Sequence, residues 1–336
     1  MTGAVDAQAT LLRFATGYRM SQLLYVAAKL GIADLLASGE KNADELAELC
    51  DAHAPSLYRA LRTLASAGVF AEDDDRRFSM TPLAEPLRSD VPGSVRGYVI
   101  MQGEPWLWNA WSLAEHSVRT GEPAFNRLHG AHIFEFLEQN PEAAAVFNAG
   151  MSGRAASADV AITRDYDFSG VRSIVDVGGG HGLMLIAVLQ AWPQMRGTLL
   201  DRPAVAEGAR ERIAAAGLAD RCQVLGGDFF DSVPAGADCY VLANVIHDWD
   251  DDAAISILRT CHAAMQPGSR ILIVEAILPA GNEPHPGKIG DVQMLVITGG
   301  QERTELQFRT LLTASGFTPT RVWPTTSTVS IVEGRR

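Results

Sequence analysis

Asp176-Val-Gly178-Gly179-Gly180-His181-Gly182 is a glycine-rich turn between a strand-like run, 173–177, and an amphipathic segment. Glycines between a strand and a helix let the backbone approach a ligand closely, where a side chain would collide. A dinucleotide-binding loop would need a third glycine where this chain has Leu183. A phosphate-binding P-loop would need a Gly-Lys-Ser/Thr triplet, which the sequence lacks. The turn therefore fits neither pattern.

The chain on the C-terminal side of this turn alternates between two periodicities. Strand-like runs occur at residues 173–177, 197–200, 222–225, 239–242 and 270–274, and segments with helical spacing at 183–192, 204–216 and 252–265. A last helix over 306–315 and two strands within 318–332 follow. This alternation predicts an α/β fold with a parallel sheet and helices on both faces, starting near residues 167–170.

Acidic residues follow the second and third predicted strands. Asp201 lies 23 residues after Gly178, where a carboxylate can accept hydrogen bonds from both ribose hydroxyls. Asp228 can accept from an adenine amino group while the ring of Phe229 stacks on the base. An NAD enzyme would also use an acid such as Asp201, so the loop discriminates: its GxGxG spacing, with Gly178 and Gly180, matches loops that hold S-adenosylmethionine. Ligands of open parallel sheets bind at these strand ends.

His247 follows the fourth predicted strand in the segment NVIHDWDD, residues 244–251. An imidazole with a pKa near 6.5 can take a proton from a hydroxyl group at physiological pH. Glu275 ends the fifth strand, and Glu302 lies in GGQERT, residues 299–304. A carboxylate bonded to the second ring nitrogen would fix the tautomer and stabilise the imidazolium. By its position alone, Glu302 is equally an acidic residue at a helix N-terminus.

The N-terminal half is predicted to be helical. Helices are expected over residues 18–36 with an interruption at Gly31, over 42–49 with an Asn42 capping box, and from Pro55 towards 68. A hairpin around 72–77 and a helix start at Thr81-Pro82 follow. Helix, turn, helix and β-wing predict a winged helix. Aromatic residues concentrate between 97 and 153, and a region rich in residues such as Trp106 could line an apolar ligand site.

Composition limits the function classes. The 336 residues suggest about two domains, and a net charge of −12 argues against nucleic acid as a partner. No apolar stretch approaches the ~18–20 residues of a membrane span, and the N-terminus lacks the build of a signal peptide, so we expect a cytoplasmic protein without membrane contact. The four cysteines form no CxxC pair, which argues against structural zinc and a disulfide framework. No clustered set of metal ligands is apparent, and no metal is expected.

Four motifs together resemble the small-molecule O-methyltransferases of the caffeate and hydroxyindole type, including the bacterial natural-product branch. They are DVGGGHG (176–182), GDFF (227–230), HDWDD (247–251) and GDVQML with GGQERT (290–304). The resemblance implies a class I methyltransferase, Rossmann-like sheet in the order 3-2-1-4-5-7-6 with one antiparallel strand. We expect a winged-helix-like dimerisation domain over 1–100, a helical linker over 101–168 that contributes to the substrate pocket, and a methyltransferase domain over 169–336.

The same resemblance implies residue roles and an activity. The activity is S-adenosylmethionine-dependent methylation of an aromatic hydroxyl (a phenol or hydroxyquinone natural product) by in-line displacement, in a homodimer. His247 would be the general base, flanked by Glu275 and Glu302. The residues assigned to the cofactor are Gly178, Gly180, Asp201, Asp228 and Phe229, and those assigned to the substrate are Asp291 and Met294, with Met294 clamping a flat ring. Trp106, from the aromatic-rich region, is also expected to contact the substrate.

Two alternatives stay open at this point. A winged helix often binds DNA, which would make the chain a transcriptional regulator. Residues 41–90 carry six basic and ten acidic residues, however, and phosphate would repel this net charge of −4. Alternatively, the protein methylates nitrogen or carbon or has lost methyl transfer. His247 favours oxygen, since a phenol with a pKa of ~10 gains most from a base.

Overall fold

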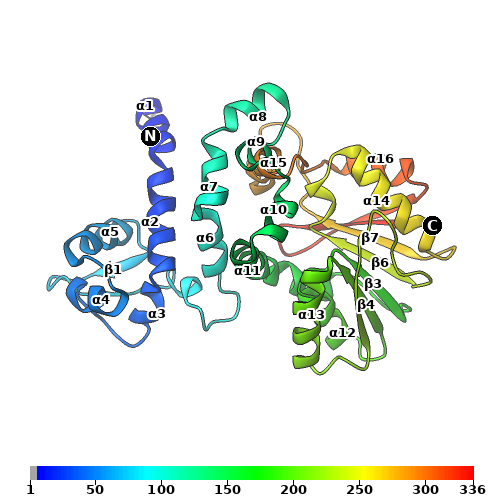
Figure 1. Cartoon of the computed structure of the whole chain (residues 1–336), viewed down its shortest axis with the longest axis horizontal. Coiled ribbons are helices and arrows are strands. Elements are labelled where there is room, and N and C mark those ends of the chain that lie inside the picture. Colours follow the sequence, from blue (N-terminus) through cyan, green and yellow to red (C-terminus); the bar gives the residue numbers. More distant parts are fainter. Residues whose placement is uncertain (1–5) are drawn as a thin grey trace, which may run out of the picture. The chain divides into compact units, whose positions relative to one another are not determined.

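The computed structural model describes residues 6–336, with side chains described outside 154–160. The chain divides into two compact units (Figure 1). One comprises the residues up to 108 together with 145–154, and the other comprises 109–144 and 155–336. The two units thus interleave within residues 101–168. The expected three-part division at residues 100 and 168 stays a prediction.

The first unit begins with helices and a small hairpin. Its elements are α1 (Ala7–Thr16), α2 (Tyr18–Lys29), α3 (Ile32–Leu36), α4 (Ala43–Cys50), α5 (Ala54–Ser66), β1 (Phe70–Glu72), β2 (Phe78–Met80), η1 (Glu85–Leu87), α6 (Arg96–Gly103) and the first half of α7 (Pro105–Trp111). Gly31, with φ +69°, separates α2 from α3, and Asn42 and Glu45 form the expected capping box of α4. The predicted winged-helix order is confirmed.

The prediction of a helix that starts at Thr81-Pro82 is wrong. These residues form a turn that leads into the short 3-10 helix η1. The Thr81 hydroxyl donates to the carbonyl of Val69 (2.7 Å), which fixes the turn to the end of α5 and the hairpin. Pro86 then has no N–H to donate to the carbonyl four residues earlier, so an α-helix cannot propagate through it.

The second unit contains the sheet. Its strands are β3 (Ser173–Val177), β4 (Arg196–Asp201), β5 (Cys222–Gly226), β6 (Cys239–Ala243), β7 (Arg270–Glu275), β8 (Thr318–Pro324) and β9 (Ser330–Arg335). They lie in the order β5-β4-β3-β6-β7-β9-β8. β9 runs antiparallel to both of its neighbours, whereas the pairs from β5 to β7 are parallel. This is the expected order 3-2-1-4-5-7-6 with one antiparallel strand.

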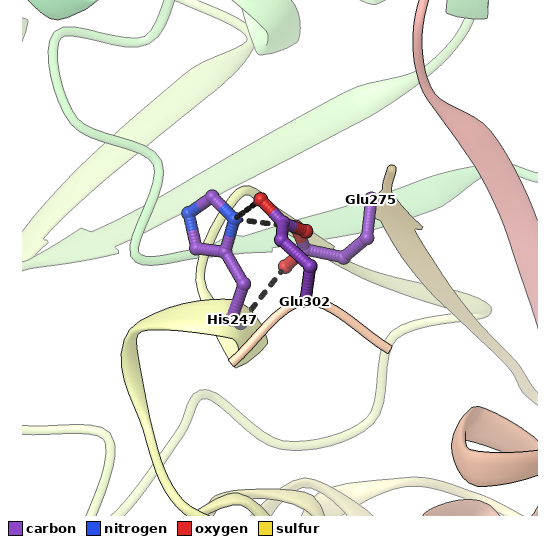
Figure 2. Close-up of side chains that lie close together, drawn as sticks. All are labelled: His247, Glu275 and Glu302. Carbon is purple, nitrogen blue, oxygen red and sulfur yellow. Dashed lines mark hydrogen bonds and ion pairs between the residues drawn. The ribbon is translucent and has the colours of Figure 1, made fainter. Parts of the chain in front are cut away.

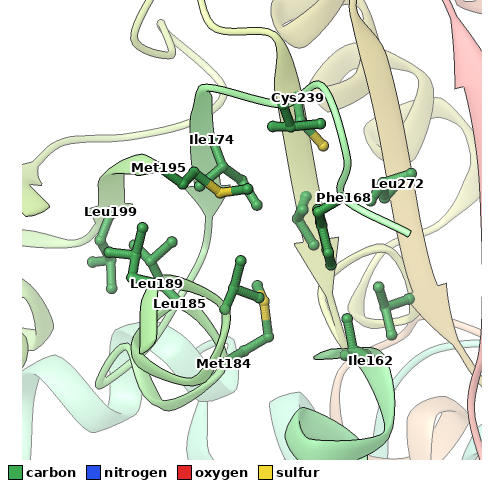
Figure 3. Close-up of a cluster of buried hydrophobic side chains, with 14 of the residues drawn as sticks. Ile162, Phe168, Ile174, Met184, Leu185, Leu189, Met195, Leu199, Cys239 and Leu272 are labelled. Atoms are coloured by element: carbon green, nitrogen blue, oxygen red, sulfur yellow. The ribbon is translucent and has the colours of Figure 1, made fainter. Parts of the chain in front are cut away.

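Helices cover both faces of this sheet (Figure 1). The helices that lie wholly in this unit are α8 (Ala114–Thr120), α9 (Ala124–His129), α10 (Ile133–Gln139), α12 (Leu183–Ala191), α13 (Pro203–Ala215), η2 (Ile246–Asp248), α14 (Asp251–Ala264), α15 (Pro286–Ile297) and α16 (Glu305–Ala314). Helix α11 (Pro141–Asp165) is shared, because its residues 145–154 belong to the first unit. Ile174 of β3 belongs to a buried cluster with residues of α11 and α12 (Figure 3). Residues of α13 complete this cluster, whereas the neighbouring Val175 belongs to a second cluster with residues of α14 and α16. Successive strand residues point to opposite faces, so each strand serves both cores.

None of the described helices is both long and apolar enough to cross a membrane.

Candidate active site

The glycine-rich turn after β3 packs against two other predicted site segments. Gly178, Gly180 and Gly182 have φ values of +72°, +56° and +77°, which residues other than glycine rarely adopt. A Cβ on Gly178 would lie 2.8 Å from Cγ2 of Val245 and 3.5 Å from Cε1 of Phe229. Glycine is therefore needed at this position, because the turn packs closely against the segment of His247 and against the ring of Phe229.

Asp201, at the end of β4, is tied to this turn. Its Oδ2 accepts a hydrogen bond from the Gly180 N–H (2.7 Å), and its Oδ1 accepts one from the Arg202 N–H (2.7 Å). Burial raises the pKa of Asp201, and these two N–H groups oppose the rise. The structure thus brings the predicted ribose-binding carboxylate into direct contact with the predicted cofactor loop.

Phe229 lies beside an aromatic ring that the sequence analysis did not assign. Trp249 packs edge-to-face against Phe229 (centroids 6.0 Å apart) and Phe230 (4.8 Å), and the His132 ring stacks on Trp249 (5.6 Å, 9° between planes). Asp228 is exposed, and its Oδ1 accepts from the Phe230 N–H (2.8 Å). Trp249 belongs to the quoted HDWDD motif, which was the available signal. Its packing fixes the orientation of the Phe229 ring.

His247, Glu275 and Glu302 converge into one buried cluster (Figure 2). His247 lies on η2, Glu275 ends β7, and Glu302 precedes α16. Nδ1 of His247 is 3.1 Å from Oε1 of Glu302 and 3.2 Å from Oε2 of Glu275. The three residues are at most 4% exposed. One carboxylate was expected at the second ring nitrogen, but both face Nδ1. Nε2, which lies 3.8 Å from Oδ1 of Asp248, is then the nitrogen for proton exchange.

Glu275 has a second task that the sequence did not reveal. Its Oε1 accepts hydrogen bonds from the backbone N–H groups of Val245 (3.0 Å), Ile246 (2.9 Å) and His247 (3.3 Å). One carboxylate therefore holds the backbone of the η2 turn with one oxygen and faces the imidazole with the other. Because a buried N–H group is costly to leave unpaired, this arrangement stabilises the turn as well as the ring.

The carboxylates change the protonation of His247. Burial alone would lower its pKa, but Glu275, Asp248 and Glu302 outweigh burial and raise the pKa to about 10. Burial also raises the pKa of Glu275, to about 7, and the charges of Glu302 and Asp248 add to this rise while His247 opposes it. The cluster therefore strongly favours an imidazolium, which is the product of proton abstraction by the ring.

These raised pKa values predict that the fold loses stability as pH rises. The folded chain keeps a proton on His247 from pH 6.5, where an unfolded histidine releases it, up to about 10, and Glu275 contributes with the same sign between 4.5 and about 7. We expect the free energy of unfolding, measured by urea denaturation, to fall between pH 7 and about 9. The fall should be shallower in Glu302→Gln, which removes a carboxylate from Nδ1. Parallel pH profiles for the two proteins would contradict this expectation.

The residues predicted to contact substrate lie in different parts of the structure. Asp291 and Met294 are on α15. Oδ1 of Asp291 accepts from the Glu302 N–H (2.9 Å), so Asp291 also holds the backbone of a cluster residue. Gln293, from the same helix, accepts from Nε1 of Trp111 (2.9 Å). Trp106 lies on α7 within the first compact unit, and its contact with substrate stays a prediction.

The triad is also a cluster of possible metal ligands. One ligand atom each from His247, Glu275 and Glu302 lie within 4.8 Å of one another. No clustered ligand set was expected from the sequence, and this expectation is wrong. The three residues lie 27 and 28 positions apart and meet only when β6, β7 and the loop before α16 are assembled. Metal-independent activity remains a prediction.

Comparison with known proteins places these features in a family. Residues 111–318 match the O-methyltransferase domain and residues 12–90 the O-methyltransferase dimerisation domain. The phenazine O-methyltransferase PhzM of Lysobacter antibioticus is 49% identical over 99% of this chain and 97% of that protein. The crystal structure of LaPhzM superposes with a TM-score of 0.95 at 48% identity, covering 98% of this chain and 99% of that one.

A second solved structure is informative about ligands. NcsB1, an O-methyltransferase from neocarzinostatin biosynthesis, was solved with S-adenosylmethionine and 2-hydroxy-5-methyl naphthoic acid. It is 36% identical, with a TM-score of 0.82, over 94% of this chain and 95% of that one. The relatives also include a phenazine-1-carboxylate N-methyltransferase of Pseudomonas aeruginosa, 34% identical over 94% of this chain and 93% of that protein.

Proposed function

This chain belongs to the O-methyltransferase family and uses S-adenosylmethionine as its methyl donor, and we propose that its acceptor is a hydroxyl group on a flat, fused aromatic ring. The observation that carries the proposal is the buried imidazole of His247 with two carboxylates at Nδ1. Two carboxylates beside Nδ1 stabilise the imidazolium that forms when Nε2 accepts a proton. The 49% identity to a phenazine O-methyltransferase supports a fused-ring acceptor.

The residues at the strand ends fit the cofactor. At Gly180 a Cβ would meet no protein atom within 4 Å, so the space beside this part of the turn is open to a ligand close to the backbone. Asp201 would accept from the ribose hydroxyls, Asp228 would accept from the adenine amino group, and Phe229 would stack on the base. S-adenosylmethionine supplies a methyl group activated by its sulfonium.

His247 would act as the general base. Its Nε2 would accept the hydroxyl proton, and the carboxylates of Glu275 and Glu302 at Nδ1 would stabilise the imidazolium formed. The raised pKa of about 10 leaves His247 mostly protonated in the ligand-free protein at pH 7, so only the neutral minority of rings can accept the hydroxyl proton. The positive sulfonium of a bound cofactor would lower this pKa and increase that minority. The remaining task is orientation of the acceptor oxygen, which can supply ~7–11 kcal/mol of the barrier.

Nitrogen is the competing acceptor, because an N-methyltransferase is among the relatives. An aromatic ring nitrogen attacks with its lone pair and needs no base, whereas a phenol gains from losing its proton. The buried His247 cluster therefore favours a hydroxyl acceptor. A regulatory role is disfavoured by the family matches to both halves of the chain and by the acidic winged helix.

The test is methylation of a small panel with the full-length protein. We expect methyl transfer from S-adenosylmethionine to a hydroxyphenazine and to a dihydroxynaphthoate, with the methyl on oxygen when the product is analysed by mass spectrometry and NMR. An aminophenazine and phenazine-1-carboxylate serve as nitrogen acceptors of matched shape. Methylation of the nitrogen acceptors alone would overturn the proposal, as would binding of S-adenosylhomocysteine without methyl transfer to any hydroxylated ring.

We also propose that the dimerisation domain pairs two copies of the chain. Leu11, Leu12 and Phe14 of α1 are each more than half exposed, and apolar surface of this kind is commonly buried between subunits. We expect light scattering at micromolar concentration to give about 72 kDa, twice the 36.1 kDa of one chain. Phe14→Glu should weaken the dimer. A mass near 36 kDa for the wild type would contradict the prediction.

A further inference from the structure

Arg303 is completely buried, although arginine is among the side chains least often found inside a protein. Its Nη1 donates to the carbonyl oxygen of Ile246 (3.0 Å), and its Nη2 donates to that of Trp249 (2.8 Å). These two carbonyls lie on either side of His247 along the chain. One guanidinium therefore holds both ends of the turn that carries the proposed base.

A third contact extends this grip to the helix after the turn. Nε and Nη2 of Arg303 donate to Oδ1 of Asp251 (3.0 and 2.8 Å), the first residue of α14. Asp251 is 59% exposed at its side chain, so the ion pair by itself contributes little to stability. The hydrogen bonds to buried carbonyls are directional, and they need the planar fork of arginine. A lysine ammonium cannot reproduce that geometry.

The loop before Arg303 is moulded to the same turn. A Cβ on Gly300 would lie 2.0 Å from the carbonyl oxygen of His247 and 2.6 Å from the backbone nitrogen of Trp249, so only glycine fits there. Two residues later, Glu302 contacts Nδ1 of the imidazole (3.1 Å). Residues 300–303 thus contact the backbone of the turn and the ring at once.

We infer that Arg303 is a positioning residue for His247: it fixes the Ile246–Trp249 backbone against the loop that carries Glu302, and thereby sets where Nε2 points. Arg303 takes no part in proton transfer. The inference rests on the proposed role of His247 as the base. An arginine is costly to bury, and among the described contacts its only carboxylate partner is the exposed Asp251. Its other contacts named above are with backbone carbonyls of the turn, so the positioning role explains why an arginine occupies this place.

The test is a double-mutant cycle between Arg303→Lys and His247→Ala on the full-length protein. In the wild-type background, Arg303→Lys should lower kcat at pH 7 by ~tenfold or more, because a small displacement of a catalytic group costs up to ~10²-fold. In the His247→Ala background the same substitution should cost less than about twofold, since the group that it positions is absent. The cost of Arg303→Lys should also shrink towards pH 10, where the acceptor ionises without a base.

Two further variants keep the test decisive. Arg309→Lys, on the partly exposed Arg309 that pairs with Glu305 (2.8 Å), is the matched control and should leave kcat within about twofold in both backgrounds. If circular dichroism shows that Arg303→Lys does not fold, Asp251→Asn takes its place. It loosens the guanidinium from α14 without emptying a buried site, and its cost of ~threefold should vanish in the His247→Ala background.

The outcomes separate this inference from the proposed function. An equal cost of Arg303→Lys, or of its substitute, in both backgrounds would overturn the positioning role while leaving His247 as the base. Wild-type turnover in His247→Ala at pH 7 would remove the base itself, and the inference with it. A cost confined to the His247 background, with S-adenosylhomocysteine affinity within about threefold of wild type, would support it.

Discussion

Replacing His247 with alanine is expected to lower turnover at pH 7 by ~10²-fold or more, with little change in the affinity for S-adenosylhomocysteine. The variant loses the ring that faces Glu275 and Glu302, but none of the groups proposed to hold the cofactor. At pH 7 only about one in a thousand molecules of a phenol with a pKa of ~10 is ionised, so a protein without a base depends on that minor species.

The pH dependence identifies the missing group. The rate of His247→Ala should rise with pH in proportion to the ionised acceptor, and the deficit relative to wild type should narrow towards pH 10. Turnover of both proteins from pH 6 to 10 on one hydroxylated aromatic acceptor measures this. His53→Ala, which changes an exposed histidine before α5, is the control and should match wild type at every pH. A variant with wild-type turnover at pH 7 would show that the acceptor arrives already ionised.

The two carboxylates should differ in what they cost. Glu302→Gln keeps a side chain of the same shape beside Nδ1 but stabilises the imidazolium poorly, so kcat should fall by less than in His247→Ala. Glu275→Gln alters the contact with Nδ1 and also weakens the acceptor of three backbone N–H groups. It should therefore lower the free energy of unfolding as well as kcat, which thermal unfolding would show.

The sheet and the cofactor loop could be predicted because their signals are local. The apolar run before Gly178 becomes β3 over Ser173–Val177, and the missing third glycine at Leu183 excludes a dinucleotide loop without knowledge of any other segment. The helix expected at Thr81 is wrong for an equally local reason. Thr81-Pro82 is a typical helix start, but Pro86, five residues after Thr81, prevents an α-helix from continuing. The prediction gave weight to the start and none to this second proline.

The base cluster shows where sequence reasoning stops. The pattern placed His247, Glu275 and Glu302 at strand and loop ends, but only the assembled sheet puts both carboxylates on the same ring nitrogen. The hydrogen bonds of Arg303 to the turn span more than 50 residues of sequence. No periodicity encodes such contacts, because they depend on how two loops pack against each other. The sequence shows Arg303 as the arginine of GGQERT, but it does not show that this arginine is buried.

Asp201→Ala is expected to weaken S-adenosylhomocysteine binding by more than tenfold, which is ~1.4 kcal/mol or more. The substitution removes the proposed acceptor of the ribose hydroxyls. It also removes the carboxylate that accepts from the Gly180 N–H (2.7 Å), so the glycine turn loses its tie to the end of β4. Isothermal titration calorimetry on the folded variant measures the loss. Asp220→Ala, at an exposed position before β5, is the matched control and should bind like wild type.

An analogue of S-adenosylhomocysteine without ribose hydroxyls separates the two effects of Asp201. If Asp201 acts through the hydroxyls, wild type should bind this analogue more weakly than the parent, and Asp201→Ala should cost little further affinity. If it acts only by holding Gly180, the substitution should weaken both ligands by the same factor. In either case the carboxylate supports the cofactor site, whereas affinity within twofold of wild type for the parent ligand would remove Asp201 from it. Both ligands are needed because Asp201→Ala removes one carboxylate that has two partners. The Gly180 N–H loses its acceptor, and the ribose hydroxyls lose theirs.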